Sequence, residues 1–93
     1  MARPVKMMVL ERCPHCKKAF EMMEQLKQQH PEYKQVEIEV IEEEQEPEKT
    51  EGYDYWYVPT FFVGDEKIME GVPKIELVEK MFQTALADEP SLV

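Results

Sequence analysis

The sequence predicts an α/β domain with a four-stranded mixed sheet and helices on both faces. An apolar run passes directly into a helical pattern at residues 5–29, and a second strand pattern follows at 35–42. Two short strand patterns, at 58–63 and 67–69, precede a final helical pattern. Strands joined through a helix are parallel with a right-handed crossover, whereas strands joined by a tight turn are antiparallel. The predicted order is β-α-β, a short helix, then β-β-α, in one domain covering residues 1–93.

Residues 5–10 (VKMMVL) are nearly all apolar, which is typical of a strand buried on both faces in the middle of a sheet. The helical pattern that follows extends from Pro14 to about Gln29, and Pro31 prevents its continuation. Apolar side chains recur along it at intervals of three and four. The predicted buried face consists of Cys16, Ala19, Phe20, Met23 and Leu26.

Residues 35–42 (QVEIEVIE) alternate between apolar and acidic side chains, which predicts an edge strand with one wet face. Its predicted buried face is Val36, Ile38 and Val40. The stretch 42–51 is mostly acidic, and we interpret its charges as a solvated surface. Pro47 within it can begin a short helix.

Three tyrosines and the only tryptophan lie within residues 53–57. They could line a substrate groove or cap the core with their polar tips in water. The strand at 58–63 carries Pro59 near its start. Because proline cannot donate to a sheet ladder, it marks an edge, a bulge or a cis bond there.

Gly64 and Asp65 predict a tight turn into the strand at 67–69, which makes a hairpin. The last helix is expected after Gly71 and Pro73, and residues 88–93 are expected to form a frayed tail. The predicted buried face of that helix is Ile75, Val78, Met81, Phe82, Ala85 and Leu86.

The 93 residues carry a formal net charge of −9, which argues against nucleic acid and anionic membranes as partners. No apolar run reaches the roughly 20 residues that span a bilayer, and no signal peptide is visible. We therefore expect a cytoplasmic monomer. In a reducing compartment, paired thiols are expected to be catalytic or metal-binding instead of forming a structural disulfide.

The only two cysteines lie in the tetrad Cys13-Pro14-His15-Cys16, where the first strand pattern meets the first helical pattern. This spacing allows a small disulfide ring or a site for a soft metal. Pro14 suits the first helical position, so Cys13 lies at the helix N-terminus, where free N–H groups favour a thiolate.

Three neighbouring side chains could also stabilise a thiolate at Cys13, by charge or by hydrogen bonding. Arg12 is adjacent to it, His15 lies between the two thiols, and Lys17 follows in the first turn. Lys17 could equally be a solvated surface residue.

Together these features resemble the thioredoxin superfamily, and the size and element order are most similar to a glutaredoxin. The resemblance covers about residues 5–87 and is carried by the Cys-Pro-His-Cys tetrad, by Val58-Pro59-Thr60 and by Gly71 before the last helix. It implies a thioredoxin-like fold and a thiol–disulfide oxidoreductase that reduces disulfides by dithiol exchange, with no metal and no bound cofactor.

The resemblance also implies roles for individual residues. Cys13 would be the exposed nucleophile and Cys16 the buried resolving thiol. Pro59 would be a cis-proline beside the sulfurs. The backbone of Val58 would bind an extended substrate as an added strand, with Tyr57 and Gly71 beside it.

The implied partners are peptides or proteins that contain disulfides, with glutathione as a candidate reductant. Glutaredoxins usually place an acidic pair after the glycine that precedes the last helix, whereas here Gly71 leads into Val72-Pro73-Lys74. We therefore expect weak glutathione-dependent activity and better reduction of peptide disulfides.

A thioredoxin-type reductase recycled by a flavoprotein is the first alternative. Two other classes are a metal-binding module, whose βαββαβ order would end in a strand, and a thioredoxin-like interaction domain without catalysis. The helical pattern at the end of the chain disfavours the metal-binding module, and the intact cysteine pair disfavours the interaction domain.

Overall fold

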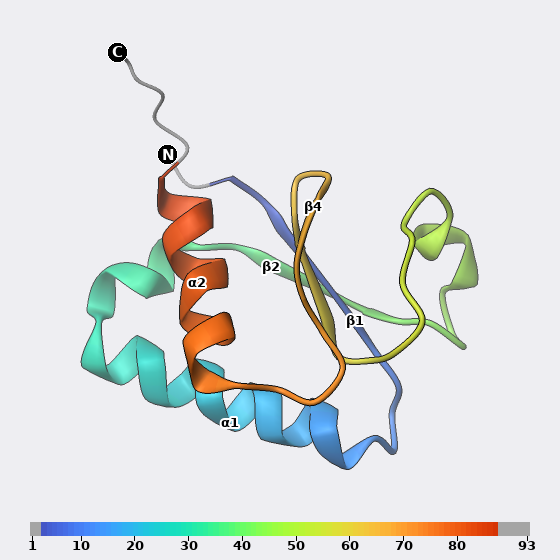
Figure 1. The fold of residues 1–93 in the computed structure, drawn as a ribbon, viewed down its shortest axis with the longest axis horizontal. Helices are drawn as coiled ribbons and strands as arrows, with labels where there is room; N and C mark the ends of the chain where they lie inside the picture. Colours follow the sequence, from blue (N-terminus) through green and yellow to red (C-terminus); the bar gives the residue numbers. More distant parts are fainter. Residues whose placement is uncertain (1–2, 88–93) are drawn as a thin grey trace.

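A computed structural model describes residues 3–87, so the predicted tail at 88–93 lies outside the described residues (Figure 1). The predicted order of elements is confirmed, with one additional short 3-10 helix. The elements are β1 (Val5–Val9), α1 (Pro14–Gln29), the 3-10 helix η1 (Pro31–Gln35), β2 (Ile38–Glu42), the 3-10 helix η2 (Pro47–Thr50), β3 (Thr60–Val63), β4 (Glu66–Glu70) and α2 (Ile75–Leu86).

The four strands form one mixed sheet in the order β2-β1-β3-β4. Strand β1 pairs in parallel with β2, and its other side pairs antiparallel with β3, which in turn pairs antiparallel with β4. The apolar run of β1 is therefore explained by its interior position, and β2 is the predicted edge strand. Strand β3 is interior, so the edge position considered for Pro59 is excluded.

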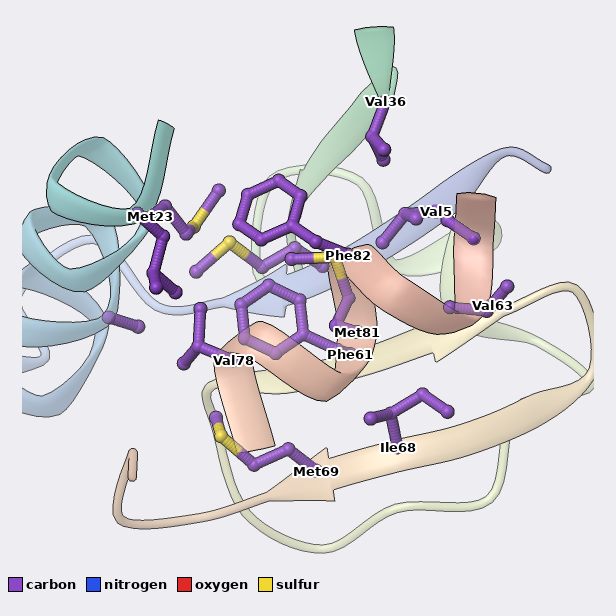
Figure 2. Packing of buried hydrophobic residues seen from close by; sticks show 14 of the residues in the cluster. Val5, Met23, Val36, Phe61, Val63, Ile68, Met69, Val78, Met81 and Phe82 are labelled. Carbon is purple, nitrogen blue, oxygen red and sulfur yellow. The ribbon is translucent and has the colours of Figure 1, made fainter. Parts of the chain in front are cut away.

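Both α-helices pack on the same face of the sheet, where they enclose the larger part of the core (Figure 1). In Figure 2, Phe61 of β3 lies beside Val78, Met81 and Phe82 of α2. The same cluster takes in the buried side of α1, which includes Ala19, Met23 and Leu26.

The opposite face carries no α-helix within residues 3–87, which corrects the prediction of helices on both faces. A smaller cluster of Met8, Ile41 and Phe62 lies there, with Tyr53 and Tyr55 packed against it. The ring centroids of Tyr53 and Phe62 are 4.7 Å apart. The acidic stretch before these tyrosines has too few apolar side chains to form a helix face, so it forms only the single turn η2.

Strand β2 begins later than predicted, because residues 31–35 form η1. Tyr33 of η1 is buried, and its ring stacks on Phe82 with centroids 4.7 Å apart. This 3-10 turn was not predicted. The short chain segment between α1 and the edge strand must return to the sheet, and burial of Tyr33 stabilises the turn that allows it.

Two residues predicted to be buried are exposed. Phe20 of α1 keeps 37% of its surface exposed and Val40 of β2 keeps 42%, whereas the neighbouring Ile41 is fully buried on the opposite face. The reason is the position of β2 at the sheet edge, where α1 covers β1 but does not extend far enough to cover the outermost strand.

Within residues 3–87, no helix is both long enough and apolar enough to cross a membrane.

Candidate active site

Cys13 is the N-cap residue of α1, and Pro14 occupies the first helical position, as predicted. The backbone of Cys13 is extended, and its N–H donates to the carbonyl of Leu10 over 3.2 Å. Its own carbonyl accepts from the N–H groups of Cys16 at 3.1 Å and Lys17 at 3.2 Å. These bonds hold the Cys13 side chain at the N-terminal end of α1, the positive end of the helix dipole.

The two thiols are free and have unlike surroundings. Cys13 is half-buried, whereas Cys16 is only 3% exposed and belongs to the core cluster. Burial, together with the neighbouring Cys13 thiol, raises the pKa of Cys16 to about 12. Cys16 therefore carries its proton at neutral pH, and Cys13 is the thiol that a partner can reach.

The segment before β3 meets the helix tip. The Sγ of Cys13 lies 3.9 Å from the carbonyl oxygen of Val58. The bond between Val58 and Pro59 is cis, which is one of the three explanations considered for this proline, and the Pro59 ring is buried. A register shift between Phe61 and Phe62 also places an irregularity further along the same strand.

Gly71 joins this group through its N–H, which donates to the Pro59 carbonyl over 3.0 Å. Its φ of +91° is in the left-handed region that favours glycine. A Cβ at this position would lie 3.8 Å from the Cβ of Tyr57. The structure thus brings together Cys13, Val58, Pro59, Tyr57 and Gly71, which lie on three separate stretches of sequence.

Sequence reasoning missed the side chains that hold the aromatic segment in place. One carboxylate oxygen of Glu70 accepts the N–H groups of Trp56 and, over 2.9 Å, Tyr57, while the other accepts from Lys67 over 2.8 Å. These donors lower the pKa of Glu70 to about 2. The buried Thr60 hydroxyl donates to the carbonyl of Tyr57. No local sequence pattern predicts that a glutamate at the end of a strand accepts hydrogen bonds from the backbone of another segment.

The aromatic residues of 53–57 lie in two different environments. Tyr53 and Tyr55 pack on Phe62 as core caps. Trp56 and Tyr57, in contrast, are 85% and 70% exposed beside Val58. The core-capping interpretation therefore applies to Tyr53 and Tyr55, and the substrate-groove interpretation of Trp56 and Tyr57 stays a prediction.

The three predicted thiolate-stabilising side chains, Arg12, His15 and Lys17, are all exposed near the helix tip. Arg12 and Cys13 line one hollow of about 420 Å³. Lys17 lines a larger groove of about 920 Å³ that contains both cysteines. His15 lies on the first turn of α1 between the two thiols.

In the part of the chain that the structure describes, no group of three or more His, Cys, Asp or Glu side chains is arranged to hold a metal ion.

The family model described as Thioredoxin domain matches residues 4–83, a span that contains the cysteine tetrad, the Val58–Pro59 bond and Gly71. No curated protein matches the chain.

Proposed function

The chain belongs to the thioredoxin-domain family, and its two nearby cysteines, Cys13 and Cys16, indicate a redox function of the thiol oxidoreductase type; we propose that it reduces disulfides of peptides or proteins by dithiol exchange, in the manner of a glutaredoxin. The observation that carries this proposal is that two thiols one helical turn apart differ in burial. Cys13 is accessible at the helix tip beside the Val58 carbonyl, and Cys16 is buried beneath it.

Each step of the exchange forms one sulfur–sulfur bond and breaks another. The Cys13 thiolate attacks one sulfur of the substrate disulfide, so that this S–S bond breaks and a mixed disulfide forms with Cys13. The released substrate thiolate takes a proton from water. Cys16 then gives its proton to water and attacks the Sγ of Cys13. The mixed disulfide breaks, the second substrate sulfur leaves as a thiolate that takes a proton from water, and the protein carries a Cys13–Cys16 disulfide. The substrate gains two electrons, and the protein has lost two.

Burial gives Cys16 the properties of a resolving thiol. With a pKa raised to about 12, it stays protonated and does not compete for the incoming substrate at neutral pH. It acts only when the mixed disulfide on Cys13 lies next to it. The order of attack follows from this difference in burial.

Binding of the substrate is proposed along Val58. An extended peptide could pair with its backbone as an added strand, while the exposed rings of Trp56 and Tyr57 supply apolar contact and Gly71 leaves room beside them. Arg12, His15 and Lys17, with the helix N-terminus that begins at Pro14, would stabilise the thiolate of Cys13.

The oxidised protein must be reduced again by an external two-electron donor. Glutathione is proposed as a donor that the protein uses only weakly. Gly71 is followed by Val72-Pro73-Lys74, and the exposed Val72 offers no partner for the amine of glutathione. A flavoprotein reductase is the alternative donor.

Trapping experiments test the proposal. With a peptide disulfide as substrate, Cys16→Ser should accumulate a mixed disulfide on Cys13, which mass spectrometry detects, whereas Cys13→Ser should neither trap nor reduce the substrate. The variant that carries serine at both positions is the control for reduction by the buffer. A mixed disulfide on Cys16 in the Cys13→Ser protein, formed as fast as the one expected on Cys13, would reverse the assignment.

A further inference from the structure

The groove of about 920 Å³ that contains both cysteines extends away from Val58, between α1 and the edge strand β2. Its lining includes Phe20 on α1 and Val40 on β2. Cys13 therefore lies between two surfaces, with the segment of Trp56 to Val58 on one side and this groove on the other. The proposed substrate site along Val58 does not use the second surface.

The floor of the groove is apolar. Phe20 and Val40 are 37% and 42% exposed, and Val9 and Leu10 line the groove with them. Both Phe20 and Val40 belong to sequence patterns that predict burial, yet no described element covers them. Two such residues, from two elements and in one groove, indicate a surface that another chain can cover.

The rim of the groove is acidic. Five glutamates and a single lysine line it, namely Glu11, Glu21, Glu24, Glu42 and Glu46 against Lys17. Four of the five carboxylates already have partners: Glu24 pairs with Lys27, Glu46 pairs with Lys49, Glu42 accepts backbone N–H groups, and Glu11 accepts from the side-chain amide of Gln45 over 3.5 Å. Glu21 makes no ion pair within residues 3–87. The local charge therefore complements a cationic occupant.

The backbone of β2 is also available along the groove. Val5 donates to the carbonyl of Glu37 over 3.1 Å, and Glu43 donates to the carbonyl of Val9 over 3.0 Å, so these residues of the β2 segment point toward β1. Because alternate residues of a parallel strand point to opposite neighbours, the N–H and C=O of Val40 point away from the sheet. An extended segment can pair there.

From the apolar floor, the acidic rim and the open strand edge, we propose that the groove binds an extended segment of the disulfide-containing protein substrate that carries both apolar residues and lysine or arginine on one strand face, at every second position. Successive side chains of an added strand point to opposite faces, so residues two apart share the face toward the groove, where the apolar ones would meet the floor and the cationic ones the rim. This inference rests on the proposed function and specifies the class of protein that the site reduces.

The test compares two peptide substrates that share one disulfide-bonded cysteine pair and differ only in the flanking segment. One flank places leucine and lysine in turn at every second residue, with serine between them, and the other has glutamate in place of each lysine. We expect kcat/KM for the lysine peptide to exceed that for the glutamate peptide by about tenfold at low ionic strength, since two or three rim pairs of modest energy are involved, and the ratio to fall in 0.5 M salt.

Charge variants locate the preference. Glu21→Lys should reduce the ratio between the two peptides by about threefold, as expected for loss and reversal of one exposed pair. Glu66→Lys is the matched control, because Glu66 is exposed on β4 at the opposite edge of the sheet and does not line the groove. The control should keep the wild-type ratio, and an equal decrease in both variants would mean that only net charge is sensed.

A binding measurement separates this inference from the proposed function. In the protein with serine at both cysteine positions, a leucine–lysine peptide without cysteine should shift the NMR signals of Phe20 and Val40. Reduction of both disulfide peptides at equal rates, with no shift at these two residues, would overturn the inference and leave the proposed function standing. Shifts at these residues without reduction of either peptide by the wild type would overturn the proposed function and leave the groove as a binding surface.

Discussion

The Sγ of Cys13 lies 3.9 Å from the carbonyl oxygen of Val58, although 45 residues separate the two in the sequence. This proximity joins the N-terminus of α1 to the segment that enters β3. A peptide that pairs with the backbone of Val58 would carry its own sulfur to the one accessible thiol, while Cys16 remains beneath it in the core.

The pH dependence of alkylation should distinguish the two thiols. In the wild type at pH 7, iodoacetamide should modify Cys13 well before Cys16, because Cys16 is buried and its pKa is raised to about 12. In Cys13→Ser, the alkylation rate of Cys16 should still rise between pH 10 and 11.5, where an ordinary thiol with a pKa of about 8.5 is already almost fully ionised. Mass spectrometry gives the rates. A plateau by pH 10 would show that Cys16 is not held in its protonated form.

Glu70→Gln should destabilise the protein at pH 7 by about 1–2 kcal/mol, because a charged acceptor of the Trp56 and Tyr57 N–H groups is lost. The folded-state pKa of Glu70, lowered to about 2, is below its unfolded value of about 4.3. Its stabilising effect is therefore complete above about pH 4.3 and disappears as the pH falls toward 2.

Urea unfolding at pH 7, 4 and 2.5 measures this difference between the variant and the wild type. Glu66→Gln, at an exposed position at the start of β4, is the control and should change little. Equal stabilities of Glu70→Gln and the wild type at pH 7 would contradict the assigned role.

Gly71→Ala should cost about 1–2 kcal/mol of stability, since a non-glycine residue at φ +91° is strained. It should also slow disulfide exchange, because the Gly71 N–H bonds to the carbonyl of Pro59. Gly52→Ala is a matched control with φ +89° and open space around it. It should lose similar stability without slowing exchange, and equal slowing in both variants would remove Gly71 from the site.

Two neighbours on β2 should lose different amounts of stability on truncation. Ile41→Ala should destabilise the protein by about 2–4 kcal/mol, because Ile41 is fully buried against Met8 and Phe62. Val40→Ala should cost less than about 1 kcal/mol, because Val40 is already 42% exposed. Denaturant unfolding of the two variants checks the corrected assignment of faces, and the reverse ranking would restore the assignment made from the sequence pattern.

His15→Gly should lower the reduction potential of the cysteine pair, because an imidazole beside the thiols can donate a hydrogen bond that favours the thiolate and thus the reduced form. A change of about 30 mV would correspond to about 1.4 kcal/mol. Equilibration with a glutathione redox buffer gives the potential. The other histidine supplies the control: His30→Gln at the end of α1 should leave the potential unchanged. A potential that His15→Gly leaves within about 10 mV of the wild type, on that scale, would mean that the imidazole does not act on the thiols.

Several features of the protein could be predicted from the sequence because they are encoded within a few neighbouring residues. The apolar run of β1 indicated an interior strand, Pro14 marked the start of α1, and the spacing of Val78, Met81, Phe82 and Ala85 identified the buried side of α2. The cysteine tetrad at the junction of β1 and α1 likewise identified the candidate site before any contact was known.

The sequence pattern could not predict which apolar residues the neighbouring elements would cover. Helical spacing assigned Phe20 to the core, and strand alternation did the same for Val40, yet both are exposed because α1 does not extend over the edge strand. Whether an amphipathic face is buried depends on how far the neighbouring helix or strand extends over it. The sequence pattern does not contain this information, because it is set by how the helices and strands pack together.

The sequence by itself determined the order of the elements, the pair of thiols and the position of Cys13 at a helix N-terminus, because capping and periodicity act over a single turn or strand. Only the tertiary structure decided that Val58 lies beside Cys13, that Glu70 holds the backbone of Trp56 and Tyr57, and that both α-helices lie on one face. These relationships join residues that are distant in the chain, and their energy is gained only when the strands pair and the helices pack.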